Sequence, residues 1–425
     1  MRIAELNGKR VAILGYGREG QAMVEALEKF VPGCEITIRD ANEKLKAKSY
    51  KLKTGPDYLN ELDAFDVLIK SPGIPPGNIP ANVRARVTNS TQIFLDTVAD
   101  AGGVLVIGVT GTKGKSTVAS LIHAMLKAAG KDAELVGNIG EPAIAHVSCH
   151  PEEPPSEASR RKNKFFVQEM SSYQLENMRS SPPVAVITSF FPEHLDYHGP
   201  LEAYREAKTN IVRFQKPGDA VLYHDDPAVR RIADASPGKK IPVTAADAPV
   251  PVAQTHLLGK HNRANIALAF TTARHLGVPE ETAVAAIRAF RGLPHRLQDL
   301  GVRRGIRWID DALSTIPESA AAAIEALGRD TATIIIGGKD RGTDPAPLWR
   351  AIARSRICTV IALGETGKHF PEAVAARTMD EAVRIAVART PEGRTCLLSP
   401  GASSYDLFKD YEDKGEQFRQ CVESQ

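Results

Sequence analysis

Two lysines, a serine and two glycines lie within the short stretch TGTKGKS, residues 110–116, between an apolar run and an amphipathic segment. Gly111 and Gly114 allow backbone N–H groups to turn toward an anion, while Lys115 offers a charge for β- and γ-phosphates and Ser116 a hydroxyl for Mg²⁺. The amino end of the following helix adds a partial positive charge. The stretch therefore predicts a nucleoside triphosphate site, and the alternative is a glycine-rich turn with an unrelated lysine.

The residues after this loop predict the helix that supports it. The loop is shorter than the general pattern G-x-x-x-x-G-K-[ST], whose first glycine would fall on Val109, but strand, loop and helix follow in the expected order. Gly130 suits the C′ position after the last turn. The buried face of the helix is predicted at i, i+3, i+4, i+7 and i+8 spacing by Val118, Leu121, Ile122, Met125 and Leu126.

Two further polar residues follow predicted strands. Glu169 lies near the end of the apolar run FFVQEM, and His194 follows the run VAVITSF. Because the carboxyl ends of parallel strands meet at one edge of a sheet, we expect these side chains beside Lys115 and Ser116. Taken one at a time, a solvated loop glutamate and a structural histidine remain open interpretations.

Lys208 lies on the apolar side of a predicted helix. Leu201, Tyr204, Ile211 and Val212 form the apolar stripe, and Lys208 falls on it at helical spacing. In one interpretation the alkyl chain packs and the ammonium reaches water. In the other, desolvation lowers the lysine pKa, and the neutral amine reacts with CO₂ to give a carbamate, an oxygen ligand suited to Mg²⁺.

The N-terminal part predicts a strand at Val11–Leu14, a glycine turn and a helix. The turn GYGREG, residues 15–20, matches G-x-G-x-x-G, and Asp40 follows the next predicted strand, where a ribose-binding acid would lie. Another predicted strand, Val67–Lys70, runs into the loop SPGIPPG. A dinucleotide site, a mononucleotide or nucleotide-sugar site, and a plain tight turn all remain open here.

A third α/β pattern begins after GLPHR, residues 292–296, where apolar strands alternate with alanine-rich helical stretches. Just before it, LLGKHNRAN opens a helix whose asparagines either cap the helix or contact a base. The strand-end loops of the third pattern carry residues that either grip a carboxylate or remain surface charge: Asp310, Asp311, Lys339, Asp340, Arg341, Ser403, Ser404 and Tyr405.

The predicted fold class is therefore α/β, with three domains that each hold a largely parallel sheet with flanking helices. We expect a Rossmann-like N-terminal domain (1–93), a P-loop central domain (94–296) and a Rossmann-like C-terminal domain (297–425). The Pro-, Glu- and Ser-rich stretch Cys149–Lys164 predicts a mobile surface insertion.

Composition limits the class of protein. The 425 residues are 43% hydrophobic and carry a net charge of only +3, so nucleic-acid binding is not expected. No apolar window of about 18 residues occurs, so a membrane span is not expected either. The five cysteines are widely spaced, which predicts neither a disulfide framework nor a thiolate metal site. The N-terminal apolar run is too short for a signal-peptide core, so we expect a cytoplasmic protein.

Together the strings TGTKGKST, VQEMSSYQLE, PEHLDYHG, GKHNRAN, GLPHR and LSPGASSYDLFKDYEDKG resemble the Mur ligase family, most closely its glutamate-adding members. The resemblance implies an ATP-dependent amide ligase of peptidoglycan precursor synthesis, which adds D-glutamate to UDP-N-acetylmuramoyl-L-alanine through an acyl phosphate. It also implies that the N-terminal domain binds the uridine nucleotide, the central domain ATP, and the C-terminal domain the amino acid. We expect a monomer that acts on small molecules.

The family's functional residues carry over onto matching positions of this sequence. The resemblance implies four catalytic residues, which are Lys115, Glu169, His194 and Lys208. Two Mg²⁺ sites are implied at Ser116, Glu169, His194 and carbamylated Lys208. The implied ATP contacts are Gly111, Thr112, Lys113, Gly114, Lys115, Ser116, Thr117, Asn265, Arg296 and Asp311. The implied contacts to the uridine substrate are Gly15, Arg18, Glu19, Asp40, Gly73 and Asn138. The implied glutamate contacts are Thr315, Arg341, Ser404, Tyr405 and Tyr411.

The sequence departs from the family at two places. DDALSTI stands where glutamate-adding members usually show DSKATN, so Leu313 replaces a lysine, and Arg18 and Glu19 replace small or apolar residues at the uridine loop. A ligase that adds L-glutamate, a folylpolyglutamate synthase-like ligase and a catalytically silent nucleotide-binding paralogue are therefore the alternatives. A nicotinamide oxidoreductase would leave the phosphate loop and Lys208 without a role.

Overall fold

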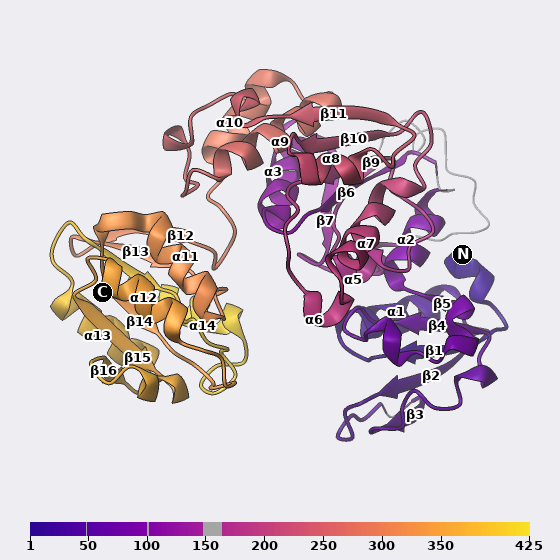
Figure 1. Ribbon diagram of the computed structural model, residues 1–425, viewed down its shortest axis with the longest axis horizontal. Helices are drawn as coiled ribbons and strands as arrows, with labels where there is room; N and C mark the ends of the chain where they lie inside the picture. The colour runs from indigo at the N-terminus through magenta and orange to yellow at the C-terminus, as the bar shows by residue number, and fades with distance from the viewer. Residues whose placement is uncertain (48, 100–101, 148–163) are drawn as a thin grey trace. The chain divides into compact units, whose positions relative to one another are not determined.

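The computed structural model describes residues 1–47, 49–99, 102–147 and 164–425, which form two compact units. The N-terminal unit comprises Met1–Pro249 with Arg263–Ile287, and the C-terminal unit comprises Val250–Asn262 with Arg288–Gln425 (Figure 1). The predicted insertion lies outside the described residues except for Lys164, which begins a strand instead. Three mostly parallel sheets with flanking helices confirm the predicted fold class.

The first sheet has the strand order β3-β2-β1-β4-β5, and its strand pairs are parallel. The strand order reverses between β1 and β4, and open α/β sheets bind ligands at the carboxyl ends of strands at such points. The predicted strand Val67–Lys70 is confirmed as β4. The bounds are β1 (Arg10–Leu14), β2 (Glu35–Asp40), β3 (Lys51–Thr54), β4 (Val67–Lys70) and β5 (Val87–Thr88).

The second sheet has the order β11-β10-β9-β6-β8-β7, and its strand pairs are also parallel. Parallel pairing brings the ends of β6, β8 and β9 to one edge, as the sequence predicts. The bounds are β6 (Val104–Thr110), β7 (Asp132–Gly137), β8 (Lys164–Glu169), β9 (Val184–Ile187), β10 (Ala220–His224) and β11 (Lys239–Val243).

Helices flank these two sheets, and the predicted amphipathic helix after the glycine loop is confirmed as α3. Its five stripe residues are fully buried, and Gly130 follows the C-cap with φ of +69°. Such a left-handed residue ends a helix most easily when it is glycine. The bounds are α1 (Arg18–Phe30), α2 (Ser90–Ala99), α3 (Lys115–Ala128), α5 (Ser172–Leu175), α6 (Leu195–His198), α7 (Leu201–Arg213), α8 (Pro227–Ala233), α9 (Asn262–His275) and α10 (Glu280–Ala289).

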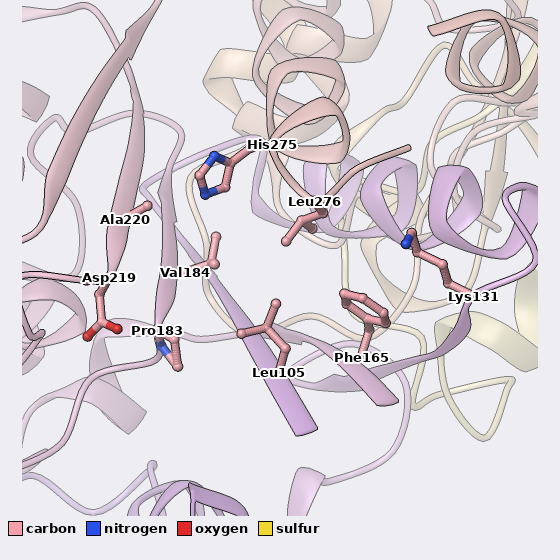
Figure 2. A pocket seen from close by; sticks show the side chains of 10 residues that line it. Leu105, Lys131, Phe165, Pro183, Val184, Asp219, Ala220, His275 and Leu276 are labelled. Carbon is pink, nitrogen blue, oxygen red and sulfur yellow. The ribbon is translucent and has the colours of Figure 1, made fainter. Parts of the chain in front are cut away.

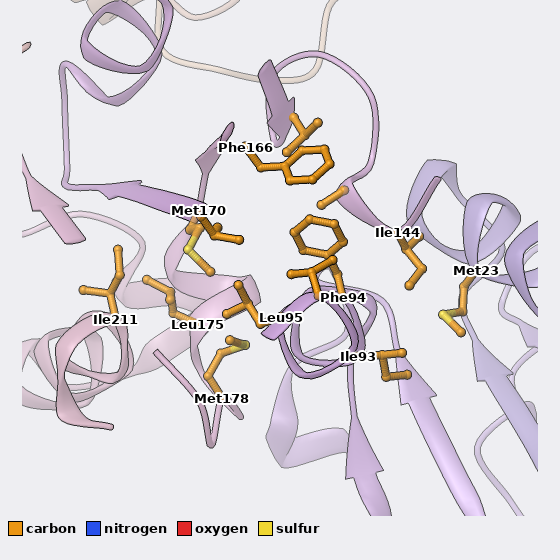
Figure 3. Close-up of a cluster of buried hydrophobic side chains, with 14 of the residues drawn as sticks. Met23, Ile93, Phe94, Leu95, Ile144, Phe166, Met170, Leu175, Met178 and Ile211 are labelled. Carbon is orange, nitrogen blue, oxygen red and sulfur yellow. The ribbon is translucent and has the colours of Figure 1, made fainter. Parts of the chain in front are cut away.

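One hydrophobic core joins the first two sheets. Figure 3 shows Met23 of α1, Phe94 of α2, Phe166 of β8 and Ile211 of α7 in the same cluster of buried side chains. Phe94 and Phe166 meet edge to face, with ring centroids 5.2 Å apart. Aromatic pairs in this arrangement stabilise beyond their buried area. The shared core agrees with the single compact unit that the two sheets form.

A cavity of about 360 Å³ opens at the amino ends of the second sheet. Figure 2 shows Leu105, Phe165 and Val184 from the first residues of β6, β8 and β9, with His275 and Leu276 at the end of α9. This edge is opposite to the one that carries the glycine loop. None of the predicted site residues lines the cavity.

The C-terminal unit holds a sheet of order β12-β13-β17-β14-β15-β16, in which only the pair β12–β13 is antiparallel. Separate buried clusters on its two faces contain side chains of α13 and α14 and side chains of α11 and α12. The bounds are β12 (Gln298–Arg303), β13 (Ile306–Asp310), β14 (Thr331–Ile336), β15 (Thr359–Leu363), β16 (Val374–Ala376), β17 (Thr395–Leu398), α11 (Pro317–Leu327), α12 (Ala346–Arg354), α13 (Met379–Arg389) and α14 (Tyr411–Glu423).

Two expectations from composition bear on the described part of the chain. Within it, no helix has the length and apolarity needed to cross a membrane. The cysteines it contains, Cys34, Cys358, Cys396 and Cys421, are free thiols.

Candidate active site

The glycine loop between β6 and α3 adopts a backbone that only glycine allows at two positions. Gly111 has φ of +150°, and a Cβ there would overlap the Thr188 hydroxyl. Gly114 has φ of +85°, and a Cβ there would lie 2.5 Å from Asn265 Oδ1. Asn265, on α9, is therefore packed against the glycine loop, and both are predicted to contact the same nucleotide.

Residues that follow β9 hold the loop in place. The Thr188 hydroxyl donates to the Lys113 carbonyl at 2.6 Å, and the Lys113 N–H donates to Ser189 Oγ at 2.9 Å. The Thr112 N–H donates to the Ser189 carbonyl at 2.8 Å. Three hydrogen bonds thus fix the loop before any ligand binds, which is the preorganisation that anion binding requires.

The charged residues of the loop differ in their surroundings. Lys115 is the first residue of α3, and its ammonium donates to the Thr112 carbonyl at 3.0 Å, so it stays over the loop. Lys113 is exposed and pairs with Glu193. Ser116 is half-buried in the first turn, and Thr117 behind it is buried. Lys115 and Ser116 therefore lie where the sequence predicts them.

Lys208 is buried beneath the same loop. Its side chain is 1% exposed, its Nζ donates to the Gly111 carbonyl at 2.8 Å, and it lies 4.8 Å from the centre of the Tyr204 ring. The interpretation in which its ammonium reaches water is therefore wrong. Burial, with the ammonium of Lys115 as a second cause, lowers the pKa of Lys208 far below its usual value.

Glu169 ends β8 at the same edge of the sheet and is 1% exposed. Its Oε1 accepts a hydrogen bond of 3.1 Å from the Asn138 side-chain amide, and Asn138 N–H donates to its carbonyl at 3.0 Å. Within the described residues, no donor reaches the buried Oε2. A buried carboxylate oxygen without a donor suits a bound cation.

His194 precedes α6 in the left-handed conformation, with φ of +58°. Burial lowers the pKa of His194, the Glu193 carboxylate partly opposes this shift, and the ammonium groups of Lys115 and Lys113 add to it, so the neutral imidazole is favoured. A neutral ring nitrogen is the form that binds a metal ion. In the described part of the chain no three His, Cys, Asp or Glu side chains cluster as a ready metal site.

Three of the six predicted uridine-substrate residues lie at the end of β2 or on the two adjoining loops that follow β1 and β4 of the first sheet. Asp40 ends β2 and accepts the Tyr16 N–H at 2.7 Å. Ser71 donates from its hydroxyl to the Gly15 carbonyl at 2.8 Å, and a Cβ on Gly15 would lie only 2.9 Å from Ser71. Gly73 belongs to the second of these loops, so the structure brings Gly15, Asp40 and Gly73 together.

Arg18 and Glu19 begin α1, but their side chains contact residues that follow strands of the second sheet. Arg18 donates to the Gly140 carbonyl, and Glu19 accepts from Ser90 and, at 2.8 Å, from the Gln174 side chain. Both side chains thus connect α1 to loops that follow β7 and β8. Their role as uridine contacts stays a prediction.

In the C-terminal unit, the loops after β13, β14 and β17 converge. Lys339 N–H donates to the Ser403 carbonyl at 2.7 Å, and Gly401 N–H donates to the Ser314 carbonyl, next to Thr315, at 2.8 Å. The Arg341 guanidinium lies 5.5 Å from the centre of the exposed Tyr405 ring. The hydroxyls of Ser403 and Ser404 are buried without a partner in the described chain.

Asp311, a predicted ATP contact, is buried in the C-terminal unit. It is 2% exposed and accepts from the Ser399 hydroxyl at 2.7 Å and the Leu297 N–H at 3.1 Å. Burial raises its pKa to about 6, and hydrogen bonds from Ser314, Ser399 and Leu297 partly oppose this shift, as does the nearby charge of Arg296. Arg296 therefore lies near Asp311, as expected if both serve one site.

His295 and Asp310 form a pair that the sequence analysis did not single out. The ring Nδ1 of His295 lies 2.7 Å from Asp310 Oδ2, and the His295 ring lies 6.3 Å from the ring of Tyr411, a predicted glutamate contact. The hydrogen bond with Asp310 raises the pKa of His295. The pair is stabilising below the unfolded-state pKa of histidine, and this stabilisation is lost as pH rises through the folded-state pKa.

We therefore expect Asp310→Asn to lower the free energy of unfolding of the C-terminal unit by about 1.5–3 kcal/mol near pH 6, because a charged hydrogen bond is lost. The difference in free energy of unfolding between Asp310→Asn and the wild type should become smaller at pH values well above the pKa of His295. Both tryptophans, Trp308 and Trp349, lie in this unit, so their fluorescence in urea reports its unfolding. A difference that does not change between pH 6 and 9 would contradict the charged pair.

Comparison with known proteins now adds to this geometry. A family model described as the Mur ligase middle domain matches residues 109–249. The chain is 34% identical to the UDP-N-acetylmuramoyl-L-alanine–L-glutamate ligase of Salinispora tropica, with 99% of each protein covered. The chain belongs to the Mur ligase family. A second Mur ligase relative, the UDP-N-acetylmuramoylalanine–D-glutamate ligase of Symbiobacterium thermophilum, is 32% identical, with 98% of each protein covered.

Solved Mur ligase structures share the fold of this chain. MurC from Thermotoga maritima has a TM-score of 0.56 at 18% identity, with 98% of this chain and 99% of that chain covered. MurF from the same organism, solved in complex with ADP, has a TM-score of 0.57 at 14% identity, with 100% and 97% covered. These likenesses support the three-sheet architecture, and one of these Mur ligases holds an adenine nucleotide.

Sequence reasoning missed two features of this Mur ligase. Thr188 and Ser189 secure the phosphate loop, and their position after a strand adjacent to β6 was the available signal. His295 stands within the string GLPHR but pairs with Asp310, which lies fifteen residues away on β13. Such pairs depend on how strands and loops far apart in the sequence pack together, so no short sequence pattern predicts them.

Proposed function

We propose that this chain is an ATP-dependent ligase that joins glutamate to UDP-N-acetylmuramoyl-L-alanine in peptidoglycan precursor synthesis. The observation that carries the proposal is Lys208, which is fully buried and donates to the Gly111 carbonyl of the phosphate loop at 2.8 Å. Burying an isolated lysine is costly, so its place beneath a phosphate loop indicates chemistry rather than solubility. Relatives named for this activity match the chain from end to end.

The proposed reaction has two steps. A carboxylate oxygen of the alanyl residue attacks the γ-phosphorus of ATP, ADP leaves, and an acyl phosphate forms. The glutamate amine then attacks the acyl carbon and loses a proton, and inorganic phosphate leaves as the amide forms. Lys115 and the loop N–H groups stabilise the charge on the transferred phosphoryl group. Asn265, packed against Gly114, fits the predicted contact with the nucleotide.

The residues at this edge fit Mg²⁺. Glu169 offers a buried oxygen to which nothing in the described chain donates, Ser116 a hydroxyl, and His194 a neutral imidazole. When bound, Mg²⁺ supplies charge that neutralises the phosphate oxygens. We assign one site to Ser116 and Glu169 and the other to His194 and Lys208. For the second site, the neutral Lys208 amine adds to CO₂ and releases a proton, which leaves an anionic carbamate.

The remaining assignments divide the chain among three small-molecule substrates. The uridine nucleotide is assigned to Gly15, Arg18, Glu19, Asp40 and Gly73, with Asn138 beside Glu169 at the reacting end. The boundaries 1–93, 94–296 and 297–425 stay a prediction, because contacts divide the described chain into two units only. A cytoplasmic monomer is part of the proposal.

Glutamate is assigned to the loops after β13, β14 and β17 of the C-terminal unit. Ser404 has a buried hydroxyl free of partners in the described chain, and Arg341 and Tyr405 form a cation–π pair next to it. Leu313, which is 36% exposed, supplies no charge at the position where the family resemblance predicts a lysine. Arg341 is therefore the proposed main partner of a glutamate carboxylate, with Thr315 and Tyr411 as further contacts.

We expect Arg341→Ala to raise the KM for glutamate by roughly 10- to 100-fold, because a charged hydrogen bond is worth about 1.5–3 kcal/mol. The KM for ATP should change far less. Steady-state kinetics with each substrate varied in turn measure both values, and Arg350→Ala, an exposed arginine of α12, is the matched control. An unchanged KM for glutamate would remove Arg341 from the site.

The deciding experiment supplies UDP-N-acetylmuramoyl-L-alanine and ATP with D-glutamate or L-glutamate separately and follows the product by mass. D-glutamate is the predicted substrate. L-glutamate is the second candidate, because the Salinispora tropica relative named for it is 34% identical to this chain, against 32% for the D-glutamate ligase. Product with L-glutamate alone would show that the predicted enantiomer is wrong. If neither enantiomer leads to product or to phosphate release, the proposed ligase activity is excluded.

A further inference from the structure

A second buried lysine lies at the end of β4 in the first sheet. Lys70 is 2% exposed, and its Nζ donates to the Ile74 carbonyl at 2.8 Å and to the Tyr197 hydroxyl at 3.2 Å. The Ser71 carbonyl, at 3.4 Å, is a weaker partner. The buried lysine thus hydrogen-bonds to both ends of the turn at residues 71–74, which contains Gly73.

Tyr197 holds the same turn from the central part of the unit. It lies on α6, and its hydroxyl is 2.9 Å from the Pro72 carbonyl, 3.0 Å from the Ile74 carbonyl and 3.2 Å from Glu176 Oε2. A hydroxyl has one proton, so it donates to one of these acceptors at a time while accepting from Lys70. The two side chains together bind carbonyls across the whole turn.

Stability alone gives no reason for this cluster. Glu176 Oε2 lies 3.9 Å from Lys70 Nζ, beyond hydrogen-bond distance. Burial lowers the pKa of Lys70 and raises the pKa of Glu176, so the charged form of each side chain is disfavoured. Buried pairs of this kind are often less stabilising than apolar side chains of the same volume. Such a pair can instead specify one arrangement of the backbone.

The arrangement that they specify joins two predicted parts of the active site. Tyr197 and His198 donate their backbone N–H groups to the His194 carbonyl at 3.2 and 3.0 Å, so α6 is one short turn built on His194. His198 is held by Ser172 Oγ at 3.0 Å and stacks on the Tyr173 ring. A rigid α6 therefore transmits the position of the turn at residues 71–74 to His194.

We propose that Lys70 is a positioning residue that sets the turn at residues 71–74 against α6 and aligns the uridine-substrate loop with His194. This proposal rests on the proposed function for the identity of the substrate, but the packing it describes does not. Nothing in the chemistry of Lys70 requires contact with the substrate. Its effect is exerted through the turn and through Tyr197.

The test uses Lys70→Met, which keeps the length of the side chain without its charge, Tyr197→Phe, and the double variant in the full chain. Lys53→Met is the matched control, because Lys53 lies on the same sheet and pairs with Glu61 at the surface at 2.8 Å. Hydrogen–deuterium exchange of the ligand-free proteins follows a peptide covering residues 67–79, and kinetics vary UDP-N-acetylmuramoyl-L-alanine and ATP separately.

We expect faster exchange in that peptide for Lys70→Met and Tyr197→Phe but not for Lys53→Met. The KM for the uridine substrate should rise about 10- to 100-fold in Lys70→Met, with the KM for ATP within about threefold of the wild type. The effects of the two substitutions should be less than additive, since both remove one network. A general loss of folding would instead move both KM values and the melting temperature.

Unchanged exchange in both variants would overturn the proposal, as would equal changes in the two KM values. If Lys70→Met does not fold, Tyr197→Phe decides alone, because its side chain is only half-buried and its ring is retained. Altered exchange in a protein that ligates neither glutamate enantiomer would support the positioning role while refuting the proposed function. The two failures are therefore distinguishable.

Discussion

Lys208→Ala is expected to lower kcat at least about 10²- to 10³-fold, the usual cost of losing a preorganised group that stabilises transition-state charge. The substitution removes the proposed carbamate. It also removes the hydrogen bond of 2.8 Å from Lys208 Nζ to the Gly111 carbonyl, which helps to fix the phosphate loop. Short-chain carboxylates should restore part of the activity, because alanine leaves an enclosed space in which a carboxylate can take the place of the carbamate.

Two comparison variants make this test specific. Lys208→Met also lacks the amine but fills the space, so it should be equally inactive and show no recovery with added carboxylate. Arg213→Ala, at the exposed end of the same helix, should behave as the wild type. Full activity of Lys208→Ala without additives would show that the buried amine is structural and would remove it from the proposed mechanism.

Lys115→Ala should abolish acyl-phosphate formation, with a loss in kcat of about 10³-fold or more, because the γ-phosphoryl oxygens lose their main side-chain cation. The ammonium is already held over the loop by the Thr112 carbonyl at 3.0 Å, so little reorganisation is needed when ATP binds. Binding of the uridine substrate should survive, since its proposed residues other than Asn138 belong to the strands, loops and helix of the first sheet.

Trapping of the acyl phosphate by reduction, followed by mass analysis, measures the first step directly, and isothermal titration measures binding of the uridine substrate. Lys127→Ala, at the exposed far end of the same helix, is the control. Turnover at the wild-type rate by Lys115→Ala would refute the assignment of the phosphate loop. Loss of uridine-substrate binding would instead indicate that the two sites are not separate.

The sequence by itself determined the features that depend on nearby residues. A strand, two obligatory glycines and a helix with one apolar face are all local, so the phosphate loop and α3 could be predicted closely. Helical periodicity also placed Lys208 on the buried stripe of α7, as its 1% exposure confirms. Parallel strands then required Glu169 and His194 to share an edge with the loop.

Only the tertiary structure decided how distant groups pair. Lys70 meets Tyr197 across 127 positions of the chain, and Thr188 reaches the Lys113 carbonyl across 75. Such contacts depend on the packing of whole elements, which no pattern of three or four residues encodes. For the same reason the sequence left open whether Lys208 reaches water. The answer depended on the depth of α7 beneath the glycine loop, which the packing of α7 against the second sheet determines.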